Sequence, residues 1–367
     1  MSGKALLVGG TAATGPYIVD ELVAQGFDVT VYHRGTHEVP MQHDVRHLHG
    51  DPHFAESIER DLAGQTWDLA VVTYGRTRIL EEQLRDRTDR LITVGGTPVL
   101  KGWHHLRNEH FAQAGGPVGV LATETYPYEQ NGVDRLVDKM IETEQQLIDA
   151  HDKGYYSLTH LRYPVVYGKY NVLGFEPAVL ARIRDARPVF VTIDGGQQLA
   201  TRIAAPNAAH AIGLAARQPE AASGQIYNVG DDEQFTLRQW VELVASHAGH
   251  DFRFVDVPSD LVVTGALPAM DGARGAGRFH RLTSTAKIKT QLGYEDVVSP
   301  SEWVAESLAW GFEQLPPESP VDEYRLEDEL IATWSLILQE QGPALSSAAR
   351  FRHPYDHPAS PSEGQTL

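Results

Sequence analysis

Residues 6–17 read LLVGGTAATGPY. An apolar run leads into two glycines, a turn of small residues and a third glycine, and a helical pattern follows directly over 16–26. Strand, glycine turn and helix in this order are typical of a phosphate cradle, because the amides and the positive dipole at a helix N-terminus attract an anion. The opening of the chain therefore predicts a nucleotide-binding turn.

Three positions at a spacing of three define this turn. We expect Gly9 to allow the tight bend and Gly15 to let the helix pack closely on the strand, whereas Ala12 places one methyl group where backbone approaches phosphate. A purely structural turn is the alternative, but the position at the first strand–helix junction favours a cofactor site. The expected cofactor-binding residues of the loop are Gly9, Thr11, Ala12, Ala13, Thr14 and Gly15.

Short strands and helices alternate along the first half of the chain. The expected strands lie at 5–9, 28–35, 45–51, 68–75, 90–96 and 155–168, and the longest expected helix spans 131–152. This alternation predicts an α/β fold, a Rossmann-type doubly wound parallel sheet. The second half mixes short elements and predicts a smaller C-terminal α/β substrate domain.

The expected domain boundaries follow this change of pattern. Residues 1–170 form the dinucleotide-binding domain, and 200–232 return to it. Residues 171–199 and 233–342 form the substrate-binding domain, and the Ser-, Pro- and Ala-rich segment 343–367 is a tail or arm.

Composition limits the classes of function. The 367 residues carry a formal net charge of −18, which argues against a nucleic-acid or anionic-membrane partner. The absence of cysteine excludes disulfides, thiolate catalysis and cysteine-based zinc sites. The first apolar run is too short for a signal peptide, and no run reaches the roughly 20 residues of a membrane span, so we expect a cytoplasmic location.

The ends of the next strands indicate which dinucleotide the turn would bind. The second strand ends in Tyr-His-Arg-Gly, where an acidic residue would bind the ribose 2′-hydroxyl of NAD. Arg34 favours the 2′-phosphate of NADP, although a solvated arginine is the alternative. Asp51 would contact the adenine amino group, and Tyr74 and Gly75 would lie beside the ribose.

Further motifs resemble the extended short-chain dehydrogenase/reductase superfamily, which includes the NAD-dependent epimerase/dehydratase family of nucleotide sugars. The matching pieces are VGGTAATG at 8–15, LITVGGTPV at 91–99, LRYPVVYG at 161–168, YNVGDDEQFTLRQW at 227–240 and LGYEDVVSPSEWVAESLAW at 292–310. The resemblance covers about residues 3–315 and is closest to atypical branches of that superfamily. It implies the same fold, an NAD(P) cofactor, and homodimers formed through two long helices, here including 131–152.

The resemblance also implies three catalytic residues: a Tyr, a Lys four positions later, and a Ser or Thr after the fifth strand. Lys139 matches the Lys, but Arg135 stands at the Tyr position, and a guanidinium cannot act as a general base. The serine position falls on Gly95 or Gly96, with Thr97 as the nearest hydroxyl. The usual proton-transfer residues are therefore missing or replaced.

Replacements must lie where a substrate would meet the nicotinamide, at the loops after strands four, five and six. We rank Lys139 first, Thr97 second and Tyr128 third as catalytic residues. Packing is the alternative for the tyrosines, and a surface position is the alternative for the histidines. The other side chains considered are Tyr126, Glu124, Glu129, His104 and His105.

Two further groups of residues are candidates for ligand contacts. Tyr163 and Val165, after the sixth strand, would contact the nicotinamide through their backbone, as the resemblance implies. Surface positions are the more common alternative for possible anion-binding arginines. These arginines are Arg182, Arg184, Arg202 and Arg278.

Histidines cluster in QHDVRHLHGDPH, residues 42–53. Of His43, His47, His49 and His53, only His47 and His49 share one face of a predicted strand, and zinc needs three or four ligands. The sequence therefore predicts no metal site there, nor in HPYDH at 353–357.

Together these features predict an NAD(P)-dependent oxidoreductase or epimerase/dehydratase-like enzyme for a small hydroxyl or carbonyl substrate. NADP is the expected cofactor, with NAD as the alternative. A non-catalytic NADP-binding sensor or scaffold is the competing hypothesis. A third is an enzyme whose bound cofactor cycles without net redox change.

Overall fold

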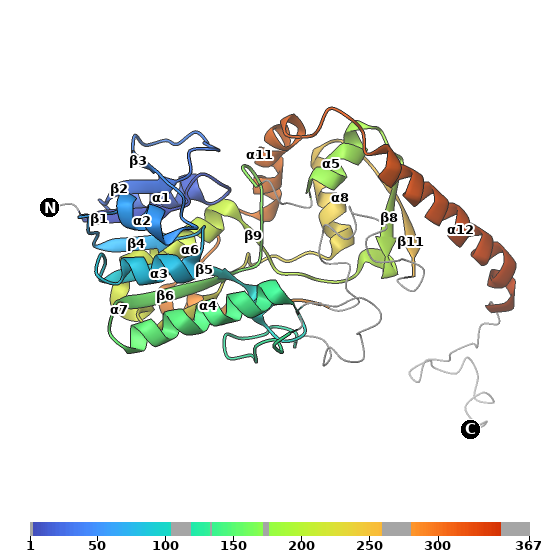
Figure 1. The fold of residues 1–367 in the computed structure, drawn as a ribbon. Coiled ribbons are helices and arrows are strands. Elements are labelled where there is room, and N and C mark those ends of the chain that lie inside the picture. The colour runs from blue at the N-terminus through green and yellow to red at the C-terminus, as the bar shows by residue number, and fades with distance from the viewer. Residues whose placement is uncertain (1–2, 104–118, 133, 172–175, 259–279, 346–367) are drawn as a thin grey trace, which may run out of the picture.

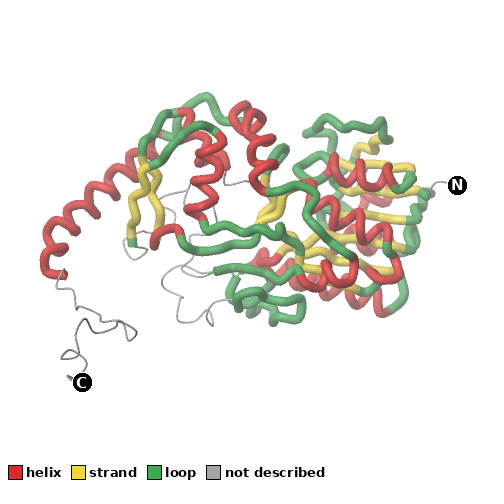
Figure 2. The backbone as a smooth tube through the Cα atoms, turned by 180° about the vertical axis from the view of Figure 1, so that it is seen from behind, coloured by secondary structure: helices red, strands yellow, loops and turns green. Residues whose placement is uncertain are grey.

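The computed structural model describes residues 3–103, 119–132, 134–171, 176–258 and 280–345. The chain forms two lobes side by side, and the N-terminal strands lie in the larger one (Figure 1). Seen from behind, strands fill the centre of the larger lobe and helices cover both of its faces (Figure 2).

A parallel sheet forms the core of the larger lobe. Its strands run in the spatial order β10-β6-β5-β4-β1-β2-β3. In the middle of the sheet, β4 is apolar and buried throughout and β1 is so after Lys4, because both faces of these strands are covered. The strands are β1 (Lys4–Val8), β2 (Asp28–His33), β3 (Arg46–His49), β4 (Leu69–Val72), β5 (Arg90–Gly96), β6 (Ser157–Tyr163) and β10 (Gln225–Asn228).

Helices cover both faces of this sheet, which confirms the predicted doubly wound α/β fold. On one face, Ile18 and Ile212 pack with Leu7 and Val31 of the strands. On the other, Ile58 and Leu84 pack on the opposite side chains of β1 and β4. The first face carries α1 (Gly15–Ala24), α6 (Ala205–Arg217), α7 (Pro219–Ala222) and α10 (Ala286–Leu292). The second carries α2 (Ala55–Asp61), α3 (Thr77–Leu84) and α4 (Arg135–Asp152).

The strand order reverses beside β1. The chain moves from β1 outward to β2 and β3, and then crosses back to β4 on the other side of β1. Ligands of open α/β sheets bind at the carboxyl ends of the strands at such a switch point. The glycine turn after β1 lies at this point.

The smaller lobe is a parallel pair of strands covered by helices. Trp240, Phe190 and Trp303 form the centre of its apolar cluster. Buried Arg182 is ion-paired with Glu323 and Glu327, which fixes the last helix to the lobe. The elements are α5 (Glu176–Arg184), β8 (Val189–Ile193), α8 (Leu237–His247), β11 (Arg253–Val257), α11 (Pro300–Glu313) and α12 (Val321–Leu345).

Contacts of α10 differ from the sequence-based domain division. The sequence places residues 233–342 in the smaller unit, yet Ile288 and Leu292 of α10 are buried in the apolar core beside the large sheet. The strand pair β7 (Val165–Tyr167) and β9 (Arg202–Ala204) lies at the junction of the lobes (Figure 1). Most of the predicted tail, residues 346–367, lies outside the described residues, and α12 extends to Leu345. Within the described part of the chain, no helix combines the length and apolar character needed to cross a bilayer.

Candidate functional site

The turn after β1 is shaped by glycines that no other residue can replace without movement. Gly9 has a φ of +105°, and a Cβ there would lie 2.5 Å from Thr73 Oγ1. A Cβ at Gly15 would lie 2.1 Å from the carbonyl oxygen of Gly10. Gly15 therefore allows the helix to start against the backbone of its own turn, as the spacing predicts.

The amides available to a ligand lie before the first turn of α1, whereas the sequence predicted amides of the helix N-terminus itself. The amide of Gly15 donates to the Ala12 carbonyl at 3.0 Å, and Pro16 has no amide hydrogen. The amides of Ala13 and Thr14 donate to no acceptor among the described residues. Anion-binding capacity is therefore concentrated in the turn just before the helix.

The methyl group of Ala12 does not fill the turn. Ala12 is exposed, whereas Ala13 is buried against Tyr167 and Ala204 at the junction of the lobes. The methyl group that was expected near the phosphate is thus exposed to solvent, and the buried side chain of Ala13 fixes the turn to the smaller lobe.

The carboxyl ends of β2, β3 and β4 bring the expected adenosine-binding residues together. The Arg34 guanidinium lies 5.6 Å from the ring centre of Tyr74. The Asp51 carboxylate accepts hydrogen bonds from the amide and the ring of His53, and these bonds lower the pKa of Asp51. Gly75, with a φ of +97°, is held against Pro52. Arg34 and Tyr74 form a charged, aromatic wall beside the glycine turn.

The end of β5 is closely packed around its two glycines. A Cβ at Gly95 would lie 2.5 Å from Nε2 of His160, and a Cβ at Gly96 would lie 2.9 Å from Cε of Met140. Neighbouring side chains therefore occupy the space that a serine would need. Thr97 begins the 3-10 turn η1 (Thr97–Val99) and is 1% exposed.

Lys139 lies on the exposed side of α4. Its Nζ is 2.6 Å from Glu142 Oε2, and Arg78 donates to its carbonyl oxygen at 3.1 Å. Arg135 is the first residue of α4 and is exposed. In the described structure, the helix thus presents a lysine paired with a glutamate and no phenol one turn before it.

Tyr128 belongs to a buried polar network that sequence reasoning missed. Its hydroxyl donates to Glu144 Oε1 at 2.6 Å, and burial followed by the Glu144 charge raises the pKa of Tyr128 to about 12. The Arg162 guanidinium also binds Glu144, through a bond of 3.0 Å from Nε. His160 completes the network, with Nε2 3.3 Å from Glu144 and Nδ1 2.7 Å from the Thr93 hydroxyl.

In this network, two positively charged or hydrogen-bonding partners keep buried Glu144 ionised. Burial raises the pKa of Glu144, but the bonds from His160 and Arg162 outweigh burial and leave that pKa well below its usual range. Glu144 is on α4, whereas His160 and Arg162 are on β6, so the network fixes the helix to the sheet. Alternating polar residues in THLRY, residues 159–163, were the available sequence signal.

The other proton-transfer candidates have structural contacts. Tyr126 accepts from the Gly119 amide, and Glu129 accepts from the amides of Gly102 and Gln130. Glu124 accepts from the Asn228 amide at 2.9 Å. His104 and His105 lie outside the described residues.

Tyr163 and Val165 flank the bend after β6. The Tyr163 hydroxyl donates to the Ala208 carbonyl at 2.8 Å, and burial raises its pKa. Its side chain therefore belongs to the core, which leaves only backbone for the predicted contact. Val165 is 43% exposed and pairs with Arg202 across β7 and β9.

Two arginines, Arg202 at the start of β9 and Arg281, are buried and close enough to interact electrostatically. Burial lowers the pKa of Arg202 to about 10, and it lowers the pKa of Arg281 to about 10 with a further contribution from Arg202. The Arg281 guanidinium lies 6.0 Å from the ring centre of Trp103, just after β5. Of the other arginines considered, Arg182 and Arg184 are engaged in the smaller lobe, and Arg278 lies outside the described residues.

Solved structures share this arrangement of strands and helices. A UDP-glucose 4-epimerase from Thermotoga maritima, solved with UDP-glucose, is 17% identical at a TM-score of 0.66, covering 85% of this chain and 100% of its own. A dTDP-glucose 4,6-dehydratase from Bacillus anthracis, solved with NAD, is 14% identical at a TM-score of 0.64, covering 85% and 97%. A UDP-glucose 4-epimerase from Bifidobacterium longum, solved with NAD+ and UDP, is 15% identical at a TM-score of 0.65, covering 85% and 98%.

The chain has the fold of the extended short-chain dehydrogenase/reductases. The resemblance drawn from its motifs is thereby confirmed at the level of structure. No protein-family model matches the sequence, and no curated protein matches it. The glycine turn, Arg34 and Tyr74 lie at the carboxyl ends of β1, β2 and β4, the edge at which ligands of open α/β sheets bind.

Proposed function

We propose that this protein binds a nicotinamide dinucleotide and acts as an NAD(P)-dependent oxidoreductase or epimerase/dehydratase-like enzyme. The observation that carries the proposal is the turn after β1, where Gly15 is packed against the Gly10 carbonyl beside the free amides of Ala13 and Thr14. A close backbone turn with free amides at a switch point fits a diphosphate. The fold of the NAD-bound dehydratase supports the same cofactor class.

The chain's own residues would hold the cofactor in three places. The amides of Ala13 and Thr14 would bind the diphosphate, the Arg34–Tyr74 wall would bind the adenosine, and Lys139 would bind the nicotinamide ribose after leaving Glu142. When bound, such a cofactor supplies hydride transfer. The protein supplies orientation and electrostatics.

The substrate would lie between the end of β5 and β9. The buried guanidiniums of Arg202 and Arg281 would contact an anionic group of the substrate there, in addition to the Glu176 carboxylate that already interacts with Arg202. Trp103 would contact the rest of the substrate. A hydroxyl or carbonyl compound carrying a phosphate, as in nucleotide sugars, meets this requirement.

Proton transfer would use Thr97 and Lys139 rather than the Tyr of the family. Thr97 follows β5 at the position nearest to the missing serine. Tyr128 is disfavoured as a base, since its phenol already donates to a carboxylate and its pKa is raised to about 12. Substitution of Thr97 or Lys139 should therefore impair turnover, whereas substitution of Tyr128 should mainly impair stability.

Tyr128→Phe tests the structural interpretation of that residue. We expect loss of the bond to Glu144 to lower the free energy of unfolding by about 1–3 kcal/mol. Turnover should change only a few-fold, whereas removal of a general base costs roughly 10²–10⁴-fold. Urea denaturation and turnover of a carbonyl panel measure both quantities, and a catalytic loss of the larger size would return Tyr128 to the reacting centre.

Arg34→Asp tests cofactor choice. We expect it to weaken NADPH binding by roughly 10- to 100-fold, because a charge-assisted bond to the 2′-phosphate is lost and a like charge replaces it. NADH binding should change little or improve. Arg60→Asp, a substitution of the same charge on the exposed surface of α2, is the control. Nicotinamide fluorescence titrations measure the four affinities, and an unchanged NADPH-to-NADH ratio in Arg34→Asp would remove Arg34 from this role.

A non-catalytic dinucleotide sensor is the second candidate, and one observation favours it. Lys139 and Tyr128 are each engaged by a carboxylate, and position 135 has no phenol. Fluorescence titration with NADH and NADPH first separates a binder from a non-binder. Turnover with a panel of carbonyl compounds and nucleotide sugars then separates an enzyme from a sensor, and a cofactor released only by denaturing the purified protein would indicate internal cycling.

The oligomeric state is part of the same proposal. α4 exposes Leu136, with 62% of its surface accessible, on a helix long enough to pair with a second copy. Light scattering on the purified protein distinguishes a homodimer from a monomer.

A further inference from the structure

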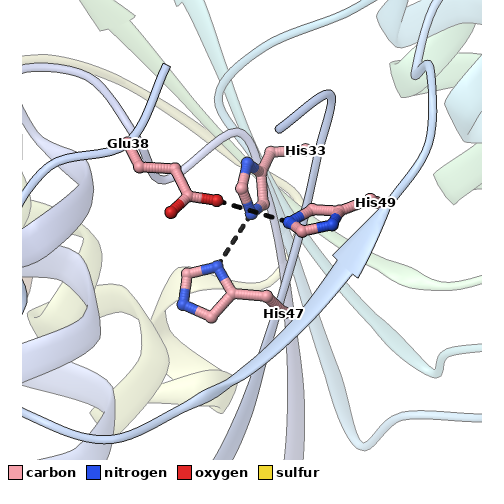
Figure 3. Close-up of side chains that lie close together, drawn as sticks. All are labelled: His33, Glu38, His47 and His49. Atoms are coloured by element: carbon pink, nitrogen blue, oxygen red, sulfur yellow. Dashed lines mark hydrogen bonds and ion pairs between the residues drawn. The ribbon is translucent and has the colours of Figure 1, made fainter. Parts of the chain in front are cut away.

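Four potential metal ligands converge at the carboxyl ends of β2 and β3. They are His33, Glu38, His47 and His49, and Figure 3 shows their side chains pointing toward one another. One ligand atom from each lies within 4.8 Å of those of the other three. His33 is 2% exposed, and the other three are exposed at the edge of the sheet.

Strand register creates this cluster. In the parallel pair β2–β3, His33 is the direct partner of His49, and Val31 is the partner of His47. Side chains two residues apart on a strand share a face, so the three imidazoles lie on one face of the sheet. The sequence alone places only His47 and His49 on a common face, because His33 joins them only through the pairing of β2 with β3.

The remaining histidines of that segment are separated from the cluster. His43 lies 3.5 Å from Asp20 of α1, and His53 binds Asp51 at 2.7 Å. The fourth ligand instead comes from the loop after β2, where Glu38 Oε1 lies 3.4 Å from His49 Nε2. His33 Nε2 lies 2.8 Å from His47 Nδ1.

We propose that His33, Glu38, His47 and His49 form a binding site for a divalent zinc-type ion. Three imidazoles and a carboxylate are ligands that Zn²⁺ accepts in tetrahedral sites, with bonds of about 2.0–2.2 Å. Ligands at these lengths lie about 3.4 Å apart in a tetrahedron. The ligand atoms of the four residues lie between 2.8 and 4.8 Å apart, a range that includes the tetrahedral spacing. Modest rotation of the exposed side chains therefore completes the site. The four protein ligands close the coordination shell, which makes the ion structural.

Metal binding would also reorganise the loop after β2. His33 Nδ1 accepts from the Gly35 amide at 3.2 Å, so in the ion-free protein the proton of His33 lies on Nε2, facing His47. Coordination through Nε2 moves that proton to Nδ1, and the Gly35 amide must then turn away. Gly35 has a φ of +72° and is exposed, so the loop is free to respond. Arg34 lies in this loop, which places the ion beside the adenosine end of the proposed cofactor site.

Zinc titration of the full chain, with any polyhistidine tag removed, tests the proposal. We expect one Zn²⁺ per chain by calorimetry, and a tetrahedral visible absorption spectrum when Co²⁺ is used as the probe. Loss of a residue that only supports a metal ligand typically weakens metal binding by about 10- to 100-fold. His47→Gln/His49→Gln removes two ligands, so we expect it to weaken Zn²⁺ binding by more than that. Both residues are exposed at the sheet edge, so the variant should fold.

His37→Gln is the matched control, since His37 is exposed in the same loop and outside the cluster. It should bind Zn²⁺ like the wild type. Amide hydrogen exchange in residues 34–38 should change on Zn²⁺ addition in the wild type and in His37→Gln only. Absence of binding by the wild-type chain, or equal binding by the double variant, would overturn the proposal. The nucleotide titrations are separate, so failure here leaves the proposed function standing.

Discussion

Gly15→Ala should abolish dinucleotide binding and lower the free energy of unfolding by about 3 kcal/mol or more. The new methyl group would lie 2.1 Å from the Gly10 carbonyl oxygen and 2.4 Å from its Cα. Both atoms are backbone, so no side-chain rotation relieves the clash, and the turn must open. Urea denaturation and NADPH fluorescence titration measure the two effects.

Gly26→Ala is the control for this substitution. Gly26 has a φ of +86°, but no atom would lie within 4 Å of its Cβ. Left-handed backbone costs an alanine about 1–2 kcal/mol, so stability falls while nucleotide binding is kept. If Gly15→Ala bound both coenzymes like the wild type, the turn would not be the cradle.

Ala12→Asp separates loss of binding from loss of folding. Ala12 is exposed, and surface substitutions usually change stability by less than about 0.5 kcal/mol. A carboxylate beside the Ala13 and Thr14 amides would repel a diphosphate. We expect a folded protein that binds neither NADH nor NADPH, and retained binding by this variant would contradict the proposed diphosphate position.

Glu144→Ala should lower the free energy of unfolding by about 3–5 kcal/mol, the cost of leaving a buried charge without its partner. Arg162 is 1% exposed and would lose its carboxylate, and Tyr128 and His160 would lose an acceptor. Urea denaturation measures the loss. Glu142→Ala, which removes an exposed partner of Lys139 on the same helix, should leave the stability nearly unchanged, because exposed ion pairs contribute little.

Glu144 also predicts how the free energy of unfolding changes with pH. The folded-state pKa of Glu144 is lowered below the unfolded value, so its contribution is present above about pH 4.3 and is lost as the pH falls below it. Wild-type stability should therefore fall on acidification more steeply than that of Glu144→Leu/Arg162→Met. At neutral pH that double variant should be less stable than the wild type, because Tyr128 and His160 still lose their acceptor, but it removes the buried ion pair whose loss on acidification is tested. A parallel pH profile for the two proteins would show that Glu144 is not ionised in the core.

Much of the fold was predictable from local signals. The apolar run of β1, the glycine turn and the helix of α1 lie within about twenty consecutive residues, and the periods that distinguish them are short-range. The same holds for β2, β4 and β5. The alternation of these elements then restricts the sheet to parallel order with right-handed crossovers.

The candidate site was predictable only where it follows the strand ends. Gly9, Arg34, Tyr74 and Thr97 lie at the carboxyl ends of four different strands, and the fold class alone brings such positions to one edge. The engagement of Tyr128 by Glu144 was not predictable, because residues separated by sixteen positions meet only after the loop folds over α4. For the same reason, the sequence could not predict that His160 fills the space beside Gly95.

The sequence by itself determined the element order and the glycine turn after β1, and it predicted which candidate residues follow the strand ends. Only the tertiary structure decided that the side chain of Ala12 faces solvent, that Lys139 and Tyr128 are bound to carboxylates, and that His33 of β2 meets His47 and His49 of β3. The physical reason is that the two kinds of property depend on interactions over different distances along the chain. Backbone propensity and periodicity act between near neighbours in the chain, whereas the protonation, exposure and ligand geometry of a side chain depend on strand register and packing between distant segments.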